Sequence, residues 1–423
     1  MIKKIIVSLC LLISLTTIAQ EATSSPYSYY GIGDFKFKGT VENRSMGGIS
    51  VFPDSIHLNL QNPAHFASIK LTNFAVGVTH ATTKATTETQ EANERRTSLD
   101  YLAVGIPIGK LGIAFGLVPY TSVGYKIGNI TNVTNSNNEV VRSIFSRYNG
   151  NGGVNKVFLG AGYKVTKKIN FGADFQYNFG TIETSNLQYQ TDLQYGTREN
   201  NFSNLRGVNI NLGLTYQTKL NAKHSFFSSI GYTPESKLKL DNSRNIEIVQ
   251  LLSSSAVIPI EREEISVEDV TVRLPSKLVL GSGFGEVKKW LVGGEISFIN
   301  NSVLSNRFND INEATFENSI RYSIGGYYIP NYASFSDYYK KIVYRGGLRY
   351  ENTGMIIQNK SITDFAANFG VGLPLGGTFS NINIGLEVGK RGTTFNNLVE
   401  ENYVNLSLGL SLSDRWFVRR KFD

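Results

Sequence analysis

The sequence predicts an all-β chain, a transmembrane antiparallel β-barrel of about 14 strands with an N-terminal plug in the lumen. Three observations lead to this fold class. Apolar residues recur with a period of two, the connections between such segments alternate between short and long, and helical periodicity is nearly absent. Beyond the N-terminal leader, no apolar run approaches the roughly 18 residues that a membrane-spanning helix needs.

The period of two is clearest in residues 168–180, KINFGADFQYNFG. Ile169, Phe171 and Phe175 share one face of the predicted strand, whereas Asp174 and Gln176 share the other. We expect the apolar face to contact lipid and the polar face to line the lumen, as in membrane barrels, rather than a soluble β-sandwich. About fourteen such segments begin near residues 69, 97, 111, 154, 168, 206, 223, 276, 289, 319, 341, 363, 381 and 402.

The connections divide into two kinds. Short turns are expected around residues 109–110, 167–168, 221–222, 287–288 and 376–377, and long polar connections at 82–96, 124–152, 182–204, 234–274 and 300–318. The connection at 330–339 is intermediate in length. Outer-membrane barrels have short periplasmic turns and long extracellular loops. We therefore expect a bacterial outer-membrane location, and an even strand count would leave both termini in the periplasm.

The first 19 residues are typical of a secretory signal peptide that is cleaved after Ala19. Lys3 and Lys4 precede an apolar stretch that is too short to span a membrane. Cys10, the only cysteine, lies within this stretch and follows Leu9, which is too large for a lipoprotein site. The expected domains are a signal peptide (1–19), a plug (20–68) and a barrel with long extracellular loops (69–423).

The plug is predicted from residues 20–68, which do not alternate. This segment is too rich in aromatic residues for a disordered tail, and Tyr27, Phe35 and Phe52 are examples. We expect it to fold inside the barrel.

Part of this segment, RSMGGISVFPDSIHLNLQNPAHFASI, resembles the N-terminal hatch of FadL/TodX-type outer-membrane transport proteins. The resemblance lies in Gly47 and Gly48, in Asp54, and in the motif of Asn62, Pro63 and Ala64 before the first strand. The C-terminal stretches YRGGLRY, GVGLPLGG and GLEVGKRGTT are similar to the Bacteroidota branch of such barrels.

The resemblance implies a fourteen-stranded barrel for passive uptake of small hydrophobic, fatty-acid-like compounds, which leave sideways beside a kinked third strand. Val118 and Pro119 fall in the predicted third strand. A proline there removes a donor from the strand ladder and favours a kink. The alternative is that Pro119 only ends this strand above the membrane.

Charged residues at predicted lumen positions do not suit a hydrophobic tunnel. They are Asp174, Glu295, Arg321, Arg345, Arg349, Asp364 and Glu387. One interpretation is that they hold the plug. The other is that the lumen binds a polar ligand, or that nothing passes through it.

No catalytic constellation, metal site or cofactor motif is predicted, so we do not expect an enzyme. The four histidines lack metal-ligand spacing, and no G-x-S-x-G motif occurs. The net charge of +8 is dispersed along the chain, which argues against a nucleic-acid partner. The expected partners are outer-membrane lipid, a hydrophobic small molecule and other outer-membrane proteins.

Two functions remain open from the sequence. The first is a transport barrel for hydrophobic compounds, favoured by the hatch motif and Pro119. The second is a non-transporting barrel that serves as a subunit of a larger outer-membrane secretion or barrel-assembly complex. The charged lumen and the long connection at 234–274 favour the second.

Overall fold

A computed structural model describes residues 25–137, 139–190, 192–252, 257–308, 314–376 and 379–416. The predicted signal peptide lies outside these residues. Fourteen strands, each corresponding to one predicted segment, pair in a closed antiparallel ring. They are β2 (Thr72–Thr86), β3 (Glu91–Ile108), β4 (Leu111–Thr134), β5 (Val140–Lys164), β6 (Ile169–Gln190), β7 (Tyr195–Lys219), β8 (His224–Thr233), β12 (Lys277–Glu286), β13 (Trp290–Ile299), β15 (Ser319–Tyr328), β16 (Val343–Ile357), β17 (Lys360–Pro374), β18 (Asn381–Gly392) and β19 (Glu400–Asp414).

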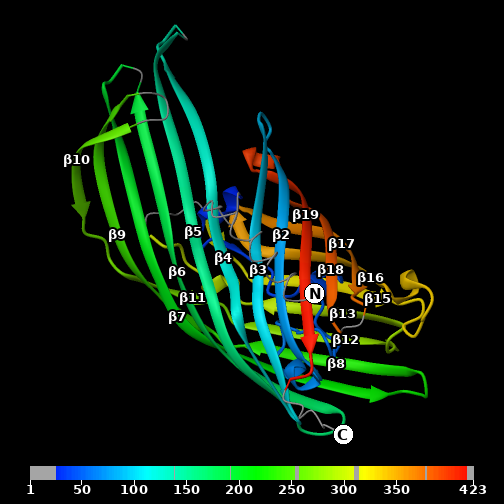
Figure 1. Cartoon of the computed structure of the whole chain (residues 1–423). Helices are drawn as coiled ribbons and strands as arrows, with labels where there is room; N and C mark the ends of the chain where they lie inside the picture. Colours follow the sequence, from blue (N-terminus) through cyan, green and yellow to red (C-terminus); the bar gives the residue numbers. More distant parts are fainter. Residues whose placement is uncertain are drawn as a thin grey trace.

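The last strand closes the ring on the first. β19 pairs with β2 along its full length, from Glu400 opposite Thr86 to Asp414 opposite Thr72 (Figure 1). Closure gives every strand of the ring two neighbours, which removes the free edges that an open sheet would expose. The predicted all-β barrel is confirmed.

The two faces of the wall differ as the alternation predicts. In β6, Phe171 and Phe175 are 47% and 52% exposed on the outside, whereas Asp174 and Gln176 are 3% and 1% exposed on the inside. The other strands repeat this pattern, and their outward apolar residues form a belt around the ring. Among the described residues, no helix is long and apolar enough to cross a membrane.

The connections predicted to be long loops are mostly strand, which corrects that expectation. β4 and β5 continue to Thr134 and Val140, which pair with each other near the tip of their hairpin. The segment 234–274 forms β9 (Ser236–Leu251), β10 (Val257–Ile265) and β11 (Val270–Leu274), which extend the ladder of β8 and β12. Beyond Lys126 both faces of β4 are exposed, so the sequence there has no apolar face to mark it as strand.

The wall separates above the ring, on the side away from the short turns. β3 and β4 pair only up to Leu102 opposite Leu117, although both strands continue further. Figure 1 shows the β2–β3 hairpin standing apart from the tall sheet that contains β4 to β7. Strand β14 (Ala314–Phe316) and the 3-10 turns η3 (Asn301–Val303), η4 (Tyr338–Lys341) and η5 (Phe395–Asn397) lie in the remaining connections.

Residues 25–71, called the N-terminal segment below, lie inside the ring. The segment contains η1 (Pro26–Tyr29), β1 (Asp34–Phe35), α2 (Val41–Arg44) and η2 (Pro63–Ser68). Its contacts reach widely separated strands: Ser50 bonds to Glu295 on β13, Glu42 to Asn383 on β18, and Asn62 to the Ile230 carbonyl on β8. The segment therefore touches opposite sides of the wall.

Glycines in the wall allow the backbone of the segment to approach closely. A Cβ atom on Gly213 of β7 would lie 1.9 Å from the Asn62 side-chain oxygen and 3.0 Å from the Ala64 nitrogen. The Gly213→Val variant should therefore displace η2, at a cost of about 1–3 kcal/mol, typical of an overpacked site. Limited proteolysis of the purified protein should detect the displacement of η2 as faster cleavage within the N-terminal segment.

Gly231→Ala on the neighbouring strand β8 is the matched control, because its Cβ would meet only Val279 at an ordinary 3.6 Å. Equal protease resistance of the Gly213→Val variant and the original protein would show that η2 is not seated against this glycine.

Candidate functional site

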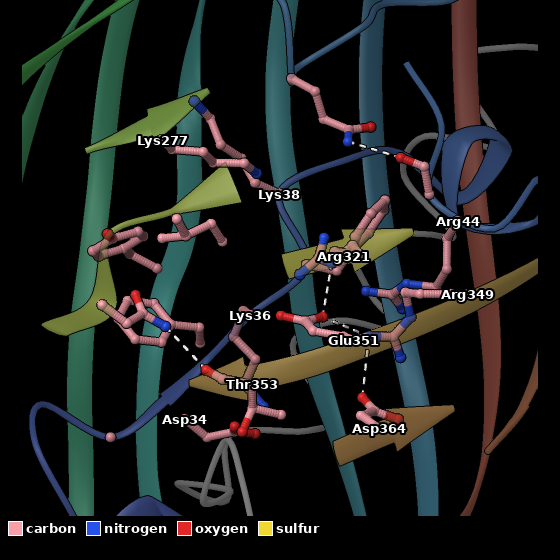
Figure 2. Close-up of a pocket in the computed structure, with 18 of the residues that line it drawn as sticks. Asp34, Lys36, Lys38, Arg44, Lys277, Arg321, Arg349, Glu351, Thr353 and Asp364 are labelled. Atoms are coloured by element: carbon pink, nitrogen blue, oxygen red, sulfur yellow. Dashed lines mark hydrogen bonds and ion pairs between the residues drawn. The ribbon is translucent and has the colours of Figure 1, made fainter. Parts of the chain in front are cut away.

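A cavity of about 320 Å³ lies between the N-terminal segment and the inner wall. Charged side chains of both signs line it, and Figure 2 shows how they converge from several strands. The inward positions of β15, β16, β17 and β18 provide one side, and the N-terminal segment, β5 and the start of β12 provide the other. The cavity is thus polar at the level where the belt outside is apolar.

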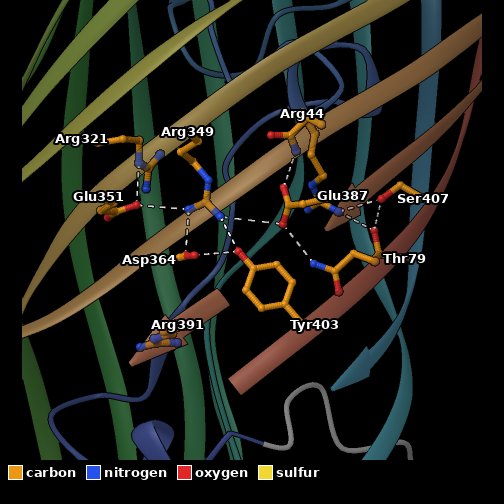
Figure 3. A network of polar contacts seen from close by, with 12 residues as sticks. Arg44, Thr79, Arg321, Arg349, Glu351, Asp364, Glu387, Arg391, Tyr403 and Ser407 are labelled. Carbon is orange, nitrogen blue, oxygen red and sulfur yellow. Dashed lines mark hydrogen bonds and ion pairs between the residues drawn. The ribbon is translucent and has the colours of Figure 1, made fainter. Parts of the chain in front are cut away.

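Arg349 is the centre of the first network of charges. Its guanidinium lies 3.1 Å from Asp364, 3.2 Å from Glu351 and 3.8 Å from Glu387. Arg321 adds a 2.7 Å contact to Glu351. Figure 3 shows the carboxylates arranged around the Arg349 side chain.

Tyr403 on β19 completes this network. Its hydroxyl donates to Asp364 at 2.7 Å and accepts from Arg349 at 2.9 Å. Each charged group here has a partner of opposite sign, so burial leaves none of these charges uncompensated.

A second network joins the N-terminal segment to the closing strands. Arg44, on α2, donates to Asp100 at 3.1 Å and to the Ser407 hydroxyl at 2.9 Å. Thr79, on β2, bonds to Arg44 (Figure 3) and to Asp100. The segment thus contacts β2, β3 and β19, where the ring closes.

β1 is held at both of its sides. Asp34 accepts a 2.7 Å hydrogen bond from Arg391 on β18. Burial opposes ionisation of Asp34, but the charge of Arg391 outweighs it and lowers the pKa of the carboxyl. On the other side, Asp34 and Phe35 pair with Ser122 and Thr121 of β4.

Two of the predicted lumen charges contact or approach the N-terminal segment. Glu295 accepts from the backbone nitrogen and hydroxyl of Ser50 at 2.8 and 2.7 Å. Arg345 donates to Asn383 at 3.0 Å, and Asn383 donates in turn to Glu42 of the segment at 2.8 Å.

The seven predicted lumen charges therefore form three groups. One network contains Arg321, Arg349, Asp364 and Glu387. Glu295 and Arg345 face the N-terminal segment. Asp174 accepts a 2.9 Å hydrogen bond from Asn211. The sequence did not predict Glu351, Arg391 and Tyr403 as site residues, nor the partners Arg44, Asp34 and Asp100. Inward positions along a strand recur every second residue, so Glu351, two residues after Arg349, and Arg391, four residues after Glu387, could have been predicted. The partners on the N-terminal segment, Arg44 and Asp34, follow no such period.

The residues of the hatch motif occupy turns of the N-terminal segment. Gly47 and Gly48 have positive φ angles of 71° and 86°. Asp54 accepts from the backbone nitrogen of Ile56 at 2.9 Å. The Asn62 side chain caps η2 by accepting from the Ala64 nitrogen at 3.0 Å, and Pro63 begins the helical turn.

Pro119 marks an irregularity in β4. The register of the β4–β5 ladder shifts between Pro119 and Thr121, and the ladder to β3 ends two residues before the proline. A proline cannot donate to a strand neighbour, which fits a site where pairing changes. Backbone atoms of the N-terminal segment occupy the vacated edge, since the Lys36 nitrogen donates to the Tyr120 carbonyl at 2.9 Å.

His57 lies at the base of the segment, 2.8 Å from Asp54 and 3.7 Å from Glu42. Burial opposes protonation of this imidazole, but the neighbouring Asp54 carboxylate outweighs burial and raises the pKa of His57. In the described part of the chain, no group of three metal-ligating side chains converges.

A family model described as BamG matches residues 1–423. The chain belongs to the BamG family. No curated protein matches it.

Solved structures with a similar fold include the CymD monoaromatic hydrocarbon channel, with 14% identity over 90% of this chain and 99% of that one and a TM-score of 0.56. The Ralstonia pickettii toluene transporter TbuX has 16% identity over 89% and 99%, with a TM-score of 0.56. A Pseudomonas aeruginosa FadL homologue has 12% identity over 90% and 98%, with a TM-score of 0.57. At these identities the similarity shows a shared barrel fold, and the named proteins are not enzymes.

Replacing Arg349 by methionine should strand the carboxylates of Glu351, Asp364 and Glu387. Removing one partner of a buried ion pair costs about 3–5 kcal/mol. Thermal or denaturant unfolding of the purified barrel measures this loss. Arg206→Met, at an exposed pair with Asp241, is the control and should change stability by less than about 1 kcal/mol. Equal effects of the two variants would contradict a stabilising role for the Arg349 network.

The contact between His57 and Asp54 predicts a pH dependence of the N-terminal segment. Because the folded-state pKa of His57 is raised, its stabilisation is fully present below its unfolded value of about 6.5 and is lost as pH rises through the folded value. The pKa of Asp54 is lowered in the folded protein, so the stabilisation from its carboxylate is present at every pH above about 4, its unfolded pKa. Protease resistance of residues 25–71 should therefore fall as pH is raised from 6 to 9.

His57→Gln should remove this pH dependence, whereas His80→Gln, on the exposed face of β2, should keep it. The same pH profile in the His57→Gln variant and the original protein would exclude His57 as the titrating group.

Proposed function

We propose that this chain is an integral β-barrel of the bacterial outer membrane and acts as a non-transporting subunit of a larger outer-membrane assembly, such as a barrel-assembly complex. The proposal rests on what occupies and lines the lumen. The N-terminal segment acts as a plug, and the space beside it is lined by charged side chains, of which Arg349, Arg321 and Arg391 are paired with carboxylates. Membership of the BamG family supports a role other than that of the similar hydrocarbon channels.

The charged lumen opposes passage of hydrophobic compounds. A hydrophobic molecule in the cavity would displace water from Arg349, Glu351 and Asp364 and offer no hydrogen bonds in return. Unsatisfied polar groups cost about 1–3 kcal/mol each in proteins. The contacts of Arg44 and Asp34 with the wall further hold the plug in place.

The outer belt and the strand count support the membrane location and orientation. A closed apolar belt is suited to lipid, and about 10 residues of a tilted strand cross a bilayer. The short turns and the end of β19 at Asp414, beside Thr72, would then lie in the periplasm, and the tall sheet would stand outside the cell. The first described residues lie toward the opposite end of the ring, where Tyr27 donates to the Val399 carbonyl.

The tall sheet provides a surface for a partner protein. β4 has 24 residues, which corresponds to about 80 Å at the rise of an extended strand, whereas the hydrocarbon core is about 30 Å thick. Near the tip of the β4–β5 hairpin, Ile130, Val140 and Val141 are 59%, 56% and 63% exposed. Exposed apolar residues clustered this far from the membrane fit a protein contact.

The end of β3–β4 pairing favours a second candidate function, transport of a hydrophobic small molecule. Above Leu102 and Leu117 the wall has no ladder between these strands, and a molecule could leave the lumen there. β1 and the Lys36 backbone cover the edge of β4 at this position, so transport would require them to move.

Photo-crosslinking in native membranes distinguishes the two functions. A crosslinking amino acid at Ile130 or Val141 should capture a defined protein partner, which also co-purifies after gentle extraction. The control position is Phe171, on the apolar belt, which should give no such product. A barrel that purifies alone, and that admits a hydrophobic fluorescent probe into proteoliposomes above the empty-liposome rate, would overturn the subunit proposal in favour of transport.

A further inference from the structure

The two sides of the lumen cavity differ in how their positive charges are satisfied. On one side, Arg349, Arg321 and Arg391 all have carboxylate partners within 3.2 Å. On the other side, three lysines line the cavity from different elements: Lys38 from the N-terminal segment, Lys156 from β5 and Lys277 from the start of β12.

The three lysines lie close enough to interact. Lys156 is within electrostatic range of both Lys38 and Lys277, and Lys277 is within range of Lys38. Figure 2 shows the side chains of Lys38 and Lys277 extending next to each other. Lys156 is only 3% exposed, and its ammonium lies 3.8 Å from the centre of the Tyr120 ring.

Nearby carboxylates offset the charge of these lysines only from a distance: Asp174 attracts Lys38 and Lys156, and Glu295 attracts Lys277. Asp174 accepts from Asn211 and Gln176, and Glu295 accepts twice from Ser50. Throughout the part of the chain that the structure describes, Lys38, Lys156 and Lys277 form no ion pair with a carboxylate. A cation–π contact compensates a buried ammonium only partly.

We propose that Lys38, Lys156 and Lys277 form a binding site for a phosphate group. Three ammonium groups converging on one polar cavity suit a dianion with several acceptor oxygens, because each lysine acts as a point charge with rotatable donors. The bound anion supplies the direct negative partner that no carboxylate of the described residues provides to these lysines. The site stands whether the barrel acts as a subunit or as a transporter.

The phosphate group has two sources. One is a soluble phosphorylated molecule that enters through the open end of the barrel. The other is the headgroup of a lipid that reaches the cavity where β3 and β4 separate, and Lys156 lies on the other side of β4 from this gap, opposite Val118 in the β4–β5 ladder.

The test uses the full chain in a neutral detergent, with inorganic phosphate as the first probe at constant ionic strength set with chloride. Phosphate should raise the melting temperature and bind by calorimetry. In the Lys38→Met/Lys277→Met double variant, phosphate affinity should fall at least about tenfold. The matched control is Lys237→Met/Lys239→Met, two exposed lysines of β9 outside the cavity.

A second measurement separates ligand binding from simple damage to the fold. Without phosphate, the Lys38→Met/Lys277→Met variant should melt at or above the temperature of the original protein, because it lacks the repulsion among the lysines. With saturating phosphate this order should reverse. A variant that melts lower in chloride alone, with an unchanged response to phosphate, would overturn the proposal.

The source is resolved by two further probes, glycerol 3-phosphate and detergent micelles that contain phosphatidic acid. A response to phosphatidic acid alone, lost in the double variant, would assign the site to a lipid headgroup. A response to inorganic phosphate and glycerol 3-phosphate would assign it to a soluble ligand. If no probe differs from chloride, the site does not bind phosphate.

Discussion

Closure of the ring by the pairing of β19 with β2 is the constraint on which the other features of this protein depend. Once the wall is closed, alternate residues must face outward or inward along every strand. The outward set is apolar and forms the belt. The inward set, from Asp174 on β6 to Glu387 on β18, is polar and enclosed, so it needs partners inside the barrel. The N-terminal segment supplies many of them, through residues such as Arg44, Ser50 and Asn62.

The separation of β3 from β4 shows how local sequence modifies this closed wall. Pro119 interrupts the register of β4, and pairing with β3 stops just before it. The free edge is then met by β1, whose Asp34 is fixed from the other side by Arg391. Asp34 thus pairs with β4 and bonds to Arg391 on β18, which lies within electrostatic range of Asp364 in the network around Arg349. The opening beside β4 and the charged cavity are therefore coupled through β1.

The sequence predicted the ring well because its signal is local. Each of the fourteen segments alternates over about ten residues, and lipid outside with a polar lumen inside preserves that alternation. The prediction of strands from the sequence failed beyond the apolar belt, because β4 past Lys126 has water on both faces and carries no apolar side. The site was predictable only in part. Arg321, Arg349, Asp364 and Glu387 were found as inward charges on strands, and their meeting follows from adjacency in the ring. The pairing of Arg44 with Asp100, or of Asp34 with Arg391, depends on how an irregular segment folds in the lumen, and no periodicity encodes that.

The distribution of arginine and lysine in the cavity follows from their different chemistry. Arginine presents a planar group that serves several carboxylates at once, as Arg349 does, and it is suited to permanent buried networks. Lysine is a compact charge on a flexible stem, and three of them without carboxylate partners make a poor permanent structure but a suitable receptor for an anion. The arginine side of the cavity is therefore the structural half, where Arg391 fixes the N-terminal segment to the wall. The lysine side is the half available for a ligand. A shared barrel fold with hydrocarbon channels is compatible with this chemistry, because the fold specifies only which positions face inward, and the side chains at those positions determine what the lumen can hold.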